Sequence, residues 1–194
     1  MRDSLLILAA ANAALAVPMA FLVKRDFARL GRVSVAIAVW TGVAMHGNAA
    51  LVIMLAWIDR GSLGSAGIET IALGGMIAAT GASIIALGWR AYASFARVYG
   101  LKEDELIERR VYRWSRNPQY VGYAIFLFGA AVMGMSTSAM ALTPFFAVFI
   151  HFYIVGVEEP HLKKTFADEY LAYMRRVPRY LGLPRPARKQ TVRL

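Results

Sequence analysis

The sequence of 194 residues contains no cysteine and few acidic residues. The lack of cysteine excludes disulfide bonds, thiolate metal sites, iron–sulfur ligation and a cysteine nucleophile. A glycine-rich phosphate or dinucleotide loop is missing as well, so no nucleotide-binding βαβ unit is expected. Any catalytic chemistry must therefore depend on other side chains and on a different kind of fold.

The shortage of acidic residues leaves a large positive charge. Twelve Asp and Glu stand against 22 Lys and Arg, which gives a net charge of +10. A nucleic-acid-binding domain would carry these cations on the exposed face of a soluble fold, whereas here they flank apolar runs. We therefore expect anionic membrane lipids as partners, and no nucleic acid.

Long apolar runs dominate the remaining sequence, of which 58% is hydrophobic and only 18% charged. A helix needs about 20 mostly apolar residues to cross a bilayer. The sequence predicts an all-α, polytopic transmembrane bundle with five spans, at about 4–23, 34–57, 67–89, 119–136 and 138–157. We expect one membrane domain over 1–194, with a three-span part (1–89), a cofactor-binding part that contains a helical hairpin (90–182) and a basic tail (183–194).

The basic residues also predict the orientation. Of the 22 Lys and Arg, 20 fall in the segments 24–33, 90–118 and 158–194, which five spans place on one side of the membrane. By the positive-inside rule that side is cytoplasmic. The N-terminus is then outside, the C-terminus is inside, and a bacterial inner membrane is the expected location.

Glycines recur every seven residues in two of the spans. They are Gly67, Gly74, Gly81 and Gly88 in the third span, and Gly122 and Gly129 in the fourth. Small residues along one stripe allow close helix packing in lipid, which we favour over a ligand groove.

A few polar residues lie within the spans. We interpret His46 and His151 as neutral, hydrogen-bonded packing residues rather than metal ligands, because neither has a second ligand at i+3 or i+4. We expect Asn12 and Asn48 to form hydrogen bonds between helices.

Charged residues gather where the fourth and fifth spans begin and end. A polar segment from Leu101 leads into Arg116-Asn117-Pro118, where proline suits the first turn of a helix. The short link at 135–138 requires a hairpin, which returns Glu158 and Glu159 to the level of Arg116. An amphipathic helix over 161–176 should cover this end, and the tail from Arg185 to Leu194 should be mobile or lipid-bound. The cluster is either an ion pair that only stabilises the bundle or a site for a zwitterionic or cationic small molecule.

These motifs resemble the integral-membrane methyltransferase family that includes isoprenylcysteine carboxyl methyltransferases and phospholipid methyltransferases. The resemblance covers about 85–182 and rests on 111–120 (VYRWSRNPQY), Glu158-Glu159, 166–170 (FADEY), Tyr173 and 177–180 (VPRY). Two positions depart from the family pattern. Asn117 replaces the histidine of an Arg-His-Pro motif and cannot act as an acid or base, and Arg110 replaces a glycine.

The resemblance implies S-adenosyl-L-methionine as methyl donor and a lipid-like or prenylated acceptor that enters between the spans. The implied cofactor-binding residues are Tyr112, Arg116, Asn117, Tyr120, Glu158 and Glu159, with Arg116 and Glu159 as catalytic candidates. No metal site is expected, and the acceptor's identity and the oligomeric state stay open. Two other hypotheses remain: an NADPH-dependent membrane reductase of the sterol type, and a non-enzymatic membrane scaffold.

Overall fold

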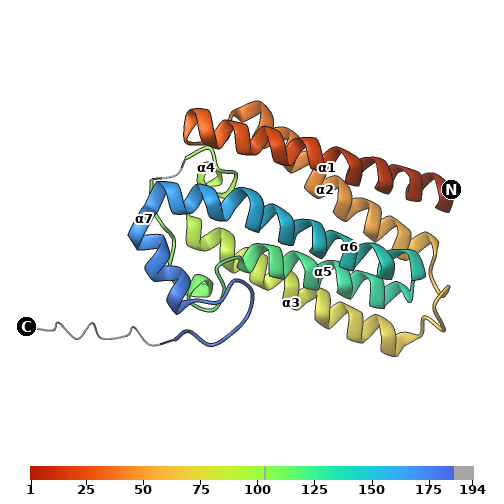
Figure 1. Cartoon of the computed structure of the whole chain (residues 1–194). Coiled ribbons are helices and arrows are strands. Elements are labelled where there is room, and N and C mark those ends of the chain that lie inside the picture. The colour runs from red at the N-terminus through yellow and green to blue at the C-terminus, as the bar shows by residue number, and fades with distance from the viewer. Residues whose placement is uncertain (103, 186–194) are drawn as a thin grey trace, which may run out of the picture.

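The structure, a computed structural model, describes residues 1–102 and 104–185 and is a bundle of long helices (Figure 1). The five predicted spans are confirmed, with somewhat different ends, and no strand occurs within the described ranges. The spans are α1 (Arg2–Leu30), α2 (Val35–Ile58), α3 (Ile68–Tyr92), α5 (Pro118–Gly134) and α6 (Thr137–Tyr153). The predicted properties of the tail concern residues beyond Arg185, which lie outside the described part.

The lengths and surfaces of these helices suit a bilayer. Helices α1, α2, α3 and the continuous helical stretch Thr137–Arg176 are long and apolar enough to cross it, and α5 is shorter. At 1.5 Å per residue, the 17 residues of α5 span about 26 Å, close to the hydrocarbon thickness. Large apolar side chains face outward along the bundle, among them Ile7, Phe21, Trp40, Trp57 and Phe152. An exterior of this kind requires lipid around it.

Helices α3 and α5 pack closely along a seam of glycines. A Cβ added at Gly74 would lie 2.6 Å from the Gly129 carbonyl oxygen, and one at Gly81 would lie 2.5 Å from the Gly122 oxygen. No side chain fits at these four positions, so the predicted packing role is confirmed. Gly67 is different, because it caps α3 and faces open space.

Hydrogen bonds to Asp59 hold the α5–α6 hairpin against the end of α2, a role that was not predicted for this residue. One carboxylate oxygen accepts hydrogen bonds from the Ser138 backbone N–H (2.9 Å) and from Ser136 Oγ (3.1 Å). These donors, above all the Ser138 N–H, lower the pKa of Asp59 despite its burial. The buried carboxylate thus accepts a hydrogen bond from a backbone N–H that has no partner within the first turn of α6, and it fixes the hairpin against α2.

The opposite end of the bundle, which we call the site end, carries the remaining elements: α4 (Phe95–Val98), η1 (Arg110–Arg113), the π-helix η2 (Ile154–Glu158) and α7 (Glu159–Arg176). Figure 1 shows α7 turning across this end. The predicted helix over 161–176 is confirmed, with non-helical backbone at Ala167. The described parts of the three predicted basic segments lie at this end, whereas Arg2 lies beside Asp59 at the other.

The polar residues within the spans behave in different ways. Asn12 Nδ2 donates to the Ala44 carbonyl oxygen on α2 (3.1 Å), as predicted. The prediction for Asn48 is wrong, because its buried Nδ2 has no hydrogen-bond partner in the described ranges. His46 Nδ1 contacts the Gly42 carbonyl oxygen of its own helix (2.7 Å) but is exposed, so it is not a packing residue. His151 Nδ1 pairs with the Tyr180 hydroxyl (2.7 Å).

Candidate active site

The site begins at the first turn of α5. Asn117 caps the helix and Pro118 occupies the first turn, as the sequence predicts. The Asn117 side chain donates to the Arg179 carbonyl oxygen (3.0 Å), and the Arg116 backbone N–H donates to that of Pro178 (3.0 Å). The segment 177–180 is therefore held against the helix start. Asn117 thus holds this segment in place.

A buried carboxylate joins Arg116 to the same segment. Glu159 accepts one hydrogen bond from Arg116 Nη1 (2.9 Å) and two from Arg179, from Nε (2.7 Å) and Nη2 (3.0 Å). The side chains of Glu159 and Arg116 are only 4% and 6% exposed. Burial alone would raise the pKa of Glu159, but the hydrogen bond from Arg179 and the charges of both arginines outweigh burial and lower it. Glu159 therefore stays ionised and fixes both guanidinium groups.

Part of Arg116 remains available. Nη1 also donates to the Tyr170 hydroxyl (3.2 Å), and the guanidinium lies 5.9 Å from the centre of the Tyr170 ring. The buried Nε has no partner in the described part of the chain. A buried charged donor without a partner is costly and rare in proteins, so Arg116 is a candidate for ligand binding.

Arg116 lines a pocket of about 70 Å³ at the site end, which we call the Arg116 pocket. Its walls come from the segment before η1, from η1 itself and from α7. The other lining residues are Tyr92, Arg97, Lys102, Glu105, Leu106, Ile107, Tyr112, Leu162, Phe166, Tyr170 and Tyr173. Arg97 and Lys102 already pair with Asp104, at 2.8 and 2.7 Å. The pocket thus combines aromatic and aliphatic walls with one incompletely paired cation.

Tyr112 forms the inner wall of this pocket. Its hydroxyl accepts a hydrogen bond from Gln119 Nε2 (3.1 Å), its carbonyl oxygen accepts one from the Tyr173 hydroxyl (2.7 Å), and its ring stacks edge-on against Tyr92. Burial, together with the neighbouring Tyr92, raises the pKa of Tyr112 well above its ordinary value. Tyr112 is therefore a neutral, rigid wall.

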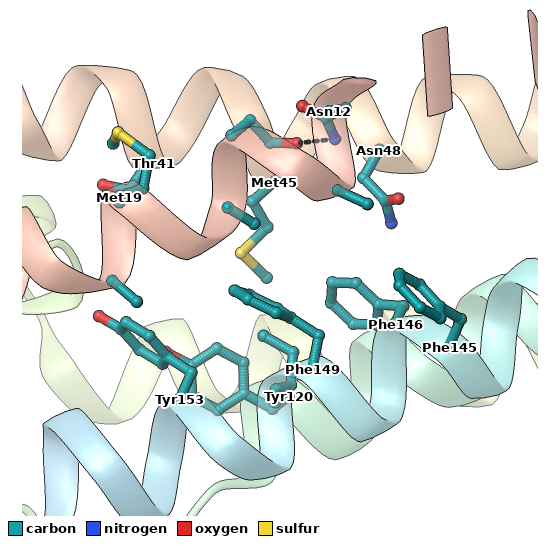
Figure 2. Close-up of a pocket in the computed structure, with 15 residues that line it drawn as sticks. Asn12, Met19, Thr41, Met45, Asn48, Tyr120, Phe145, Phe146, Phe149 and Tyr153 are labelled. Atoms are coloured by element: carbon teal, nitrogen blue, oxygen red, sulfur yellow. Dashed lines mark hydrogen bonds between the residues drawn. The ribbon is translucent and has the colours of Figure 1, made fainter. Parts of the chain in front are cut away.

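A second pocket, of about 120 Å³, lies between the α1–α2 pair and α6; we call it the apolar pocket (Figure 2). At its site end it is lined by Tyr120 and Tyr153, whose rings meet edge-on. The Tyr120 hydroxyl donates a hydrogen bond to Glu158. Most other lining side chains are apolar, from α1, α2 and α6.

The two pockets lie on either side of the start of α5. Arg116, which precedes the cap residue Asn117, lines the first, and Tyr120 in the first turn of the helix lines the second. Of the six predicted cofactor-binding residues, Tyr112 and Arg116 line the Arg116 pocket and Tyr120 lines the apolar pocket. Glu158 accepts a hydrogen bond from Tyr120, Glu159 is bonded to Arg116 and Arg179, and Asn117 donates to the Arg179 carbonyl oxygen.

Sequence reasoning did not assign several residues of the site. No role in the site was predicted for three residues that occur within the motifs, namely Arg179, Tyr170 and Tyr173. A usable signal existed for Arg179, because an arginine next to a proline, after a helix rich in carboxylates, can pair with one of them. The apolar lining residues on α1 and α2 carried no recognisable signal, because they are ordinary side chains of a span, and the sequence predicted only hydrogen bonds between helices for Asn12 and Asn48.

The sequence profile of the phospholipid methyltransferase family matches residues 69–169, from the start of α3 into α7. The matched region contains both glycine-seam helices, Arg116, Tyr120 and the paired glutamates. The chain belongs to this family. It is an integral membrane protein. The match to the family begins at the start of α3, so α1 and α2 lie outside it.

Two curated relatives are protein methyltransferases. The chain is 29% identical over 96 residues to the protein-S-isoprenylcysteine O-methyltransferase of Saccharomyces cerevisiae, which covers 47% of this chain and 38% of the yeast protein. It is 29% identical over 114 residues to protein-S-isoprenylcysteine O-methyltransferase B of Arabidopsis thaliana, covering 58% of this chain and 55% of that protein. The chain thus spans about half or less of the relatives' lengths. No solved structure gives a significant match.

Proposed function

We propose that the protein is a membrane-embedded methyltransferase that transfers a methyl group from S-adenosyl-L-methionine to a lipid-like or prenylated acceptor. The observation that carries this proposal is that a pocket with a buried cation at Arg116 and an apolar pocket at Tyr120 are lined by residues only four positions apart, at the start of α5. Membership of the family and the names of the two relatives support it.

The Arg116 pocket fits the chemistry of the donor. The unpartnered Nε of Arg116 suits a carboxylate, and the rings of Tyr170 and Phe166 suit a sulfonium or ammonium group. Leu106, Ile107 and Leu162 offer an apolar wall for an adenine ring. When bound, the donor would supply an electrophilic methyl group.

The other residues have different roles in this proposal. Glu159 orients Arg116, and Asn117 holds the 177–180 segment in place, so both act as positioning residues. Tyr120 lines the apolar pocket and donates a hydrogen bond to Glu158, and this pair would orient the acceptor's reactive group. Methyl transfer from a sulfonium reduces charge in the transition state, so orientation and exclusion of water can accelerate it without a strong acid or base.

We further propose that the site end faces the cytoplasm, as the basic residues predict, and that anionic lipids contact it there. The protein would then take its donor from the cytosol and its acceptor from the bilayer. A bacterial inner membrane remains the proposed location.

Calorimetric titration of the detergent-purified protein with S-adenosylhomocysteine tests donor binding. We expect saturable binding that Arg116→Leu weakens at least tenfold, because a charge-assisted hydrogen bond contributes about 1.5–3 kcal/mol. Arg113→Ala is the matched control, since Arg113 is exposed on η1 and lines no pocket. Lack of binding by folded wild-type protein would refute the proposal.

The same titration separates the two other hypotheses. Binding of NADPH without binding of S-adenosylhomocysteine would favour a reductase. A scaffold would bind neither compound, and Glu159→Gln would then lower stability without affecting any ligand.

A further inference from the structure

Asn48 is the residue whose surroundings the proposed function does not explain. It lies on α2 and lines the apolar pocket, and its buried Nδ2 lacks a hydrogen-bond partner within the described ranges. Figure 2 shows its amide pointing across the pocket toward Phe145 and Phe146 on α6. A buried amide donor that faces aromatic rings loses its hydration, and a contact with a ring replaces a full hydrogen bond only weakly.

The other polar side chains of the pocket are engaged. Asn12 Nδ2 donates to the Ala44 carbonyl oxygen, and Thr41 Oγ1 donates to the Ile37 and Ala38 carbonyl oxygens of its own helix. Asn48 is therefore the lining residue whose buried amide nitrogen has no hydrogen-bond partner within the described ranges. A water molecule needs two to four polar partners to be held in a protein interior, and the rings opposite Asn48 offer none.

The position of Asn48 defines a depth in the pocket. Tyr120 and Tyr153 lie at the site end, and Asn48 lies at the other end, opposite Phe145 and Phe146 (Figure 2). Phe145 and Tyr153 are eight residues apart on α6, so these ends are separated by about 12 Å at 1.5 Å per residue. An extended hydrocarbon chain advances about 1.25 Å per carbon–carbon bond, which makes this about ten carbons.

We propose that the acceptor's chain carries an oxygen atom, as a carbonyl or hydroxyl group, about ten carbons from its methyl-accepting head, and that Asn48 Nδ2 donates a hydrogen bond to it. The inference rests on the proposed function, which places the head at Tyr120. It narrows the substrate class, because a pure hydrocarbon chain, saturated or isoprenoid, leaves Asn48 unpaired.

The entry path fits such a molecule. Helix α1 packs mainly on α2 and meets the rest of the bundle near the site end, through η2 and α7. The space between α1 and α6 is the apolar pocket itself, so a lipid can reach it sideways from the bilayer.

Binding of two matched probes tests the proposal. We would compare a saturated sixteen-carbon primary alcohol with the same alcohol carrying a ketone near carbon ten, by calorimetry on the full-length protein in detergent. Wild type should bind the ketone about fivefold more tightly, the worth of one net hydrogen bond. Asn48→Leu should abolish that preference, whereas Asn12→Leu should keep it, since the Asn12 amide nitrogen is already bonded.

Equal affinity of wild type for both probes, as expected if only water occupies the site, would overturn the proposal. So would a preference that survives in Asn48→Leu. If that variant does not fold, moving the ketone along the chain gives a second test with wild type, since the preference should peak near carbon ten and a flat profile refutes it. No methyl donor is present, so failure here is distinct from failure to bind S-adenosylhomocysteine.

Discussion

At the scale of single residues, the central feature is a carboxylate held between two guanidinium groups. Glu159 is almost fully buried and bonded to Arg116 and Arg179, which come from segments on either side of it in the sequence. Removing one member of such a cluster leaves the opposite charge buried without compensation. The cluster is thus both a source of stability and the support that fixes Arg116.

We expect Glu159→Gln to lower the free energy of unfolding by about 3–5 kcal/mol near pH 7. Because folding lowers the pKa of Glu159, ionisation of this group contributes to the free energy of unfolding. The contribution is fully present above the ordinary carboxyl pKa of 4.5, and it is lost as the pH falls through the lower pKa of the folded state. The difference in the free energy of unfolding between the wild type and the variant should therefore be constant from pH 7 to about 5, and it should shrink below about pH 4.

Thermal unfolding in detergent across this pH range measures the effect. Glu108→Gln is the control, because the Glu108–Arg176 pair is partly exposed and should contribute at most about 1 kcal/mol. A Glu159→Gln effect as small as that of the control would contradict a structural role for the buried cluster.

Arg110, which departs from the glycine of the family pattern that the sequence resembles, has a backbone conformation that suits glycine. Its φ is +57°, in the left-handed region where a side chain costs about 1–2 kcal/mol. We expect Arg110→Gly to raise the free energy of unfolding by about 0.5–1 kcal/mol, after the entropic cost of glycine. Arg113→Gly, at an exposed position with negative φ, should instead lower it. Chemical unfolding curves compare the two, and equal effects would refute the strain argument.

At the scale of elements, the α3–α5 seam fixes the position of α5, which carries Tyr120 and begins two residues after Arg116. We expect Gly81→Ala to destabilise the bundle by about 1–3 kcal/mol, since the added Cβ would meet the α5 backbone at Gly122 and Phe126. Gly75→Ala on the same helix meets nothing within 4 Å and should be neutral or slightly stabilising. The melting temperatures of the two variants in detergent test this prediction. A similar decrease in melting temperature for both variants would show that the seam tolerates side chains.

At the scale of the whole molecule, the bundle's orientation is testable because the natural sequence lacks cysteine. We expect Lys164→Cys, on the exposed face of α7, to react with a membrane-impermeant maleimide only after cells are permeabilised. Ser65→Cys, exposed at the opposite end between α2 and α3, should react in intact cells. The reverse pattern would invert the proposed topology and place the Arg116 pocket away from the cytosolic donor.

The sequence by itself determined the five helices, the glycine seam and the gathering of Arg116, Glu158 and Glu159 at one end. These features depend on local rules: apolar length fixes a span, a seven-residue spacing fixes a stripe, and a short hairpin link fixes which helix ends lie together. The methyltransferase resemblance came from residues close together along the chain, and the matched family profile confirms it.

Only the tertiary structure determined which of the predicted site residues line a pocket and which hold other parts of the site in place. Whether Arg116 or Asn117 faces a cavity depends on where 177–180 returns to the start of α5, and that contact joins residues some sixty positions apart. The pairing of Glu159 with Arg179, the contact of Asp59 with the start of α6 and the buried Asn48 donor, unpaired within the described part of the chain, are set in the same way. A side chain's partners are set by which helices meet and at what rotation, and spacing within one helix does not specify either.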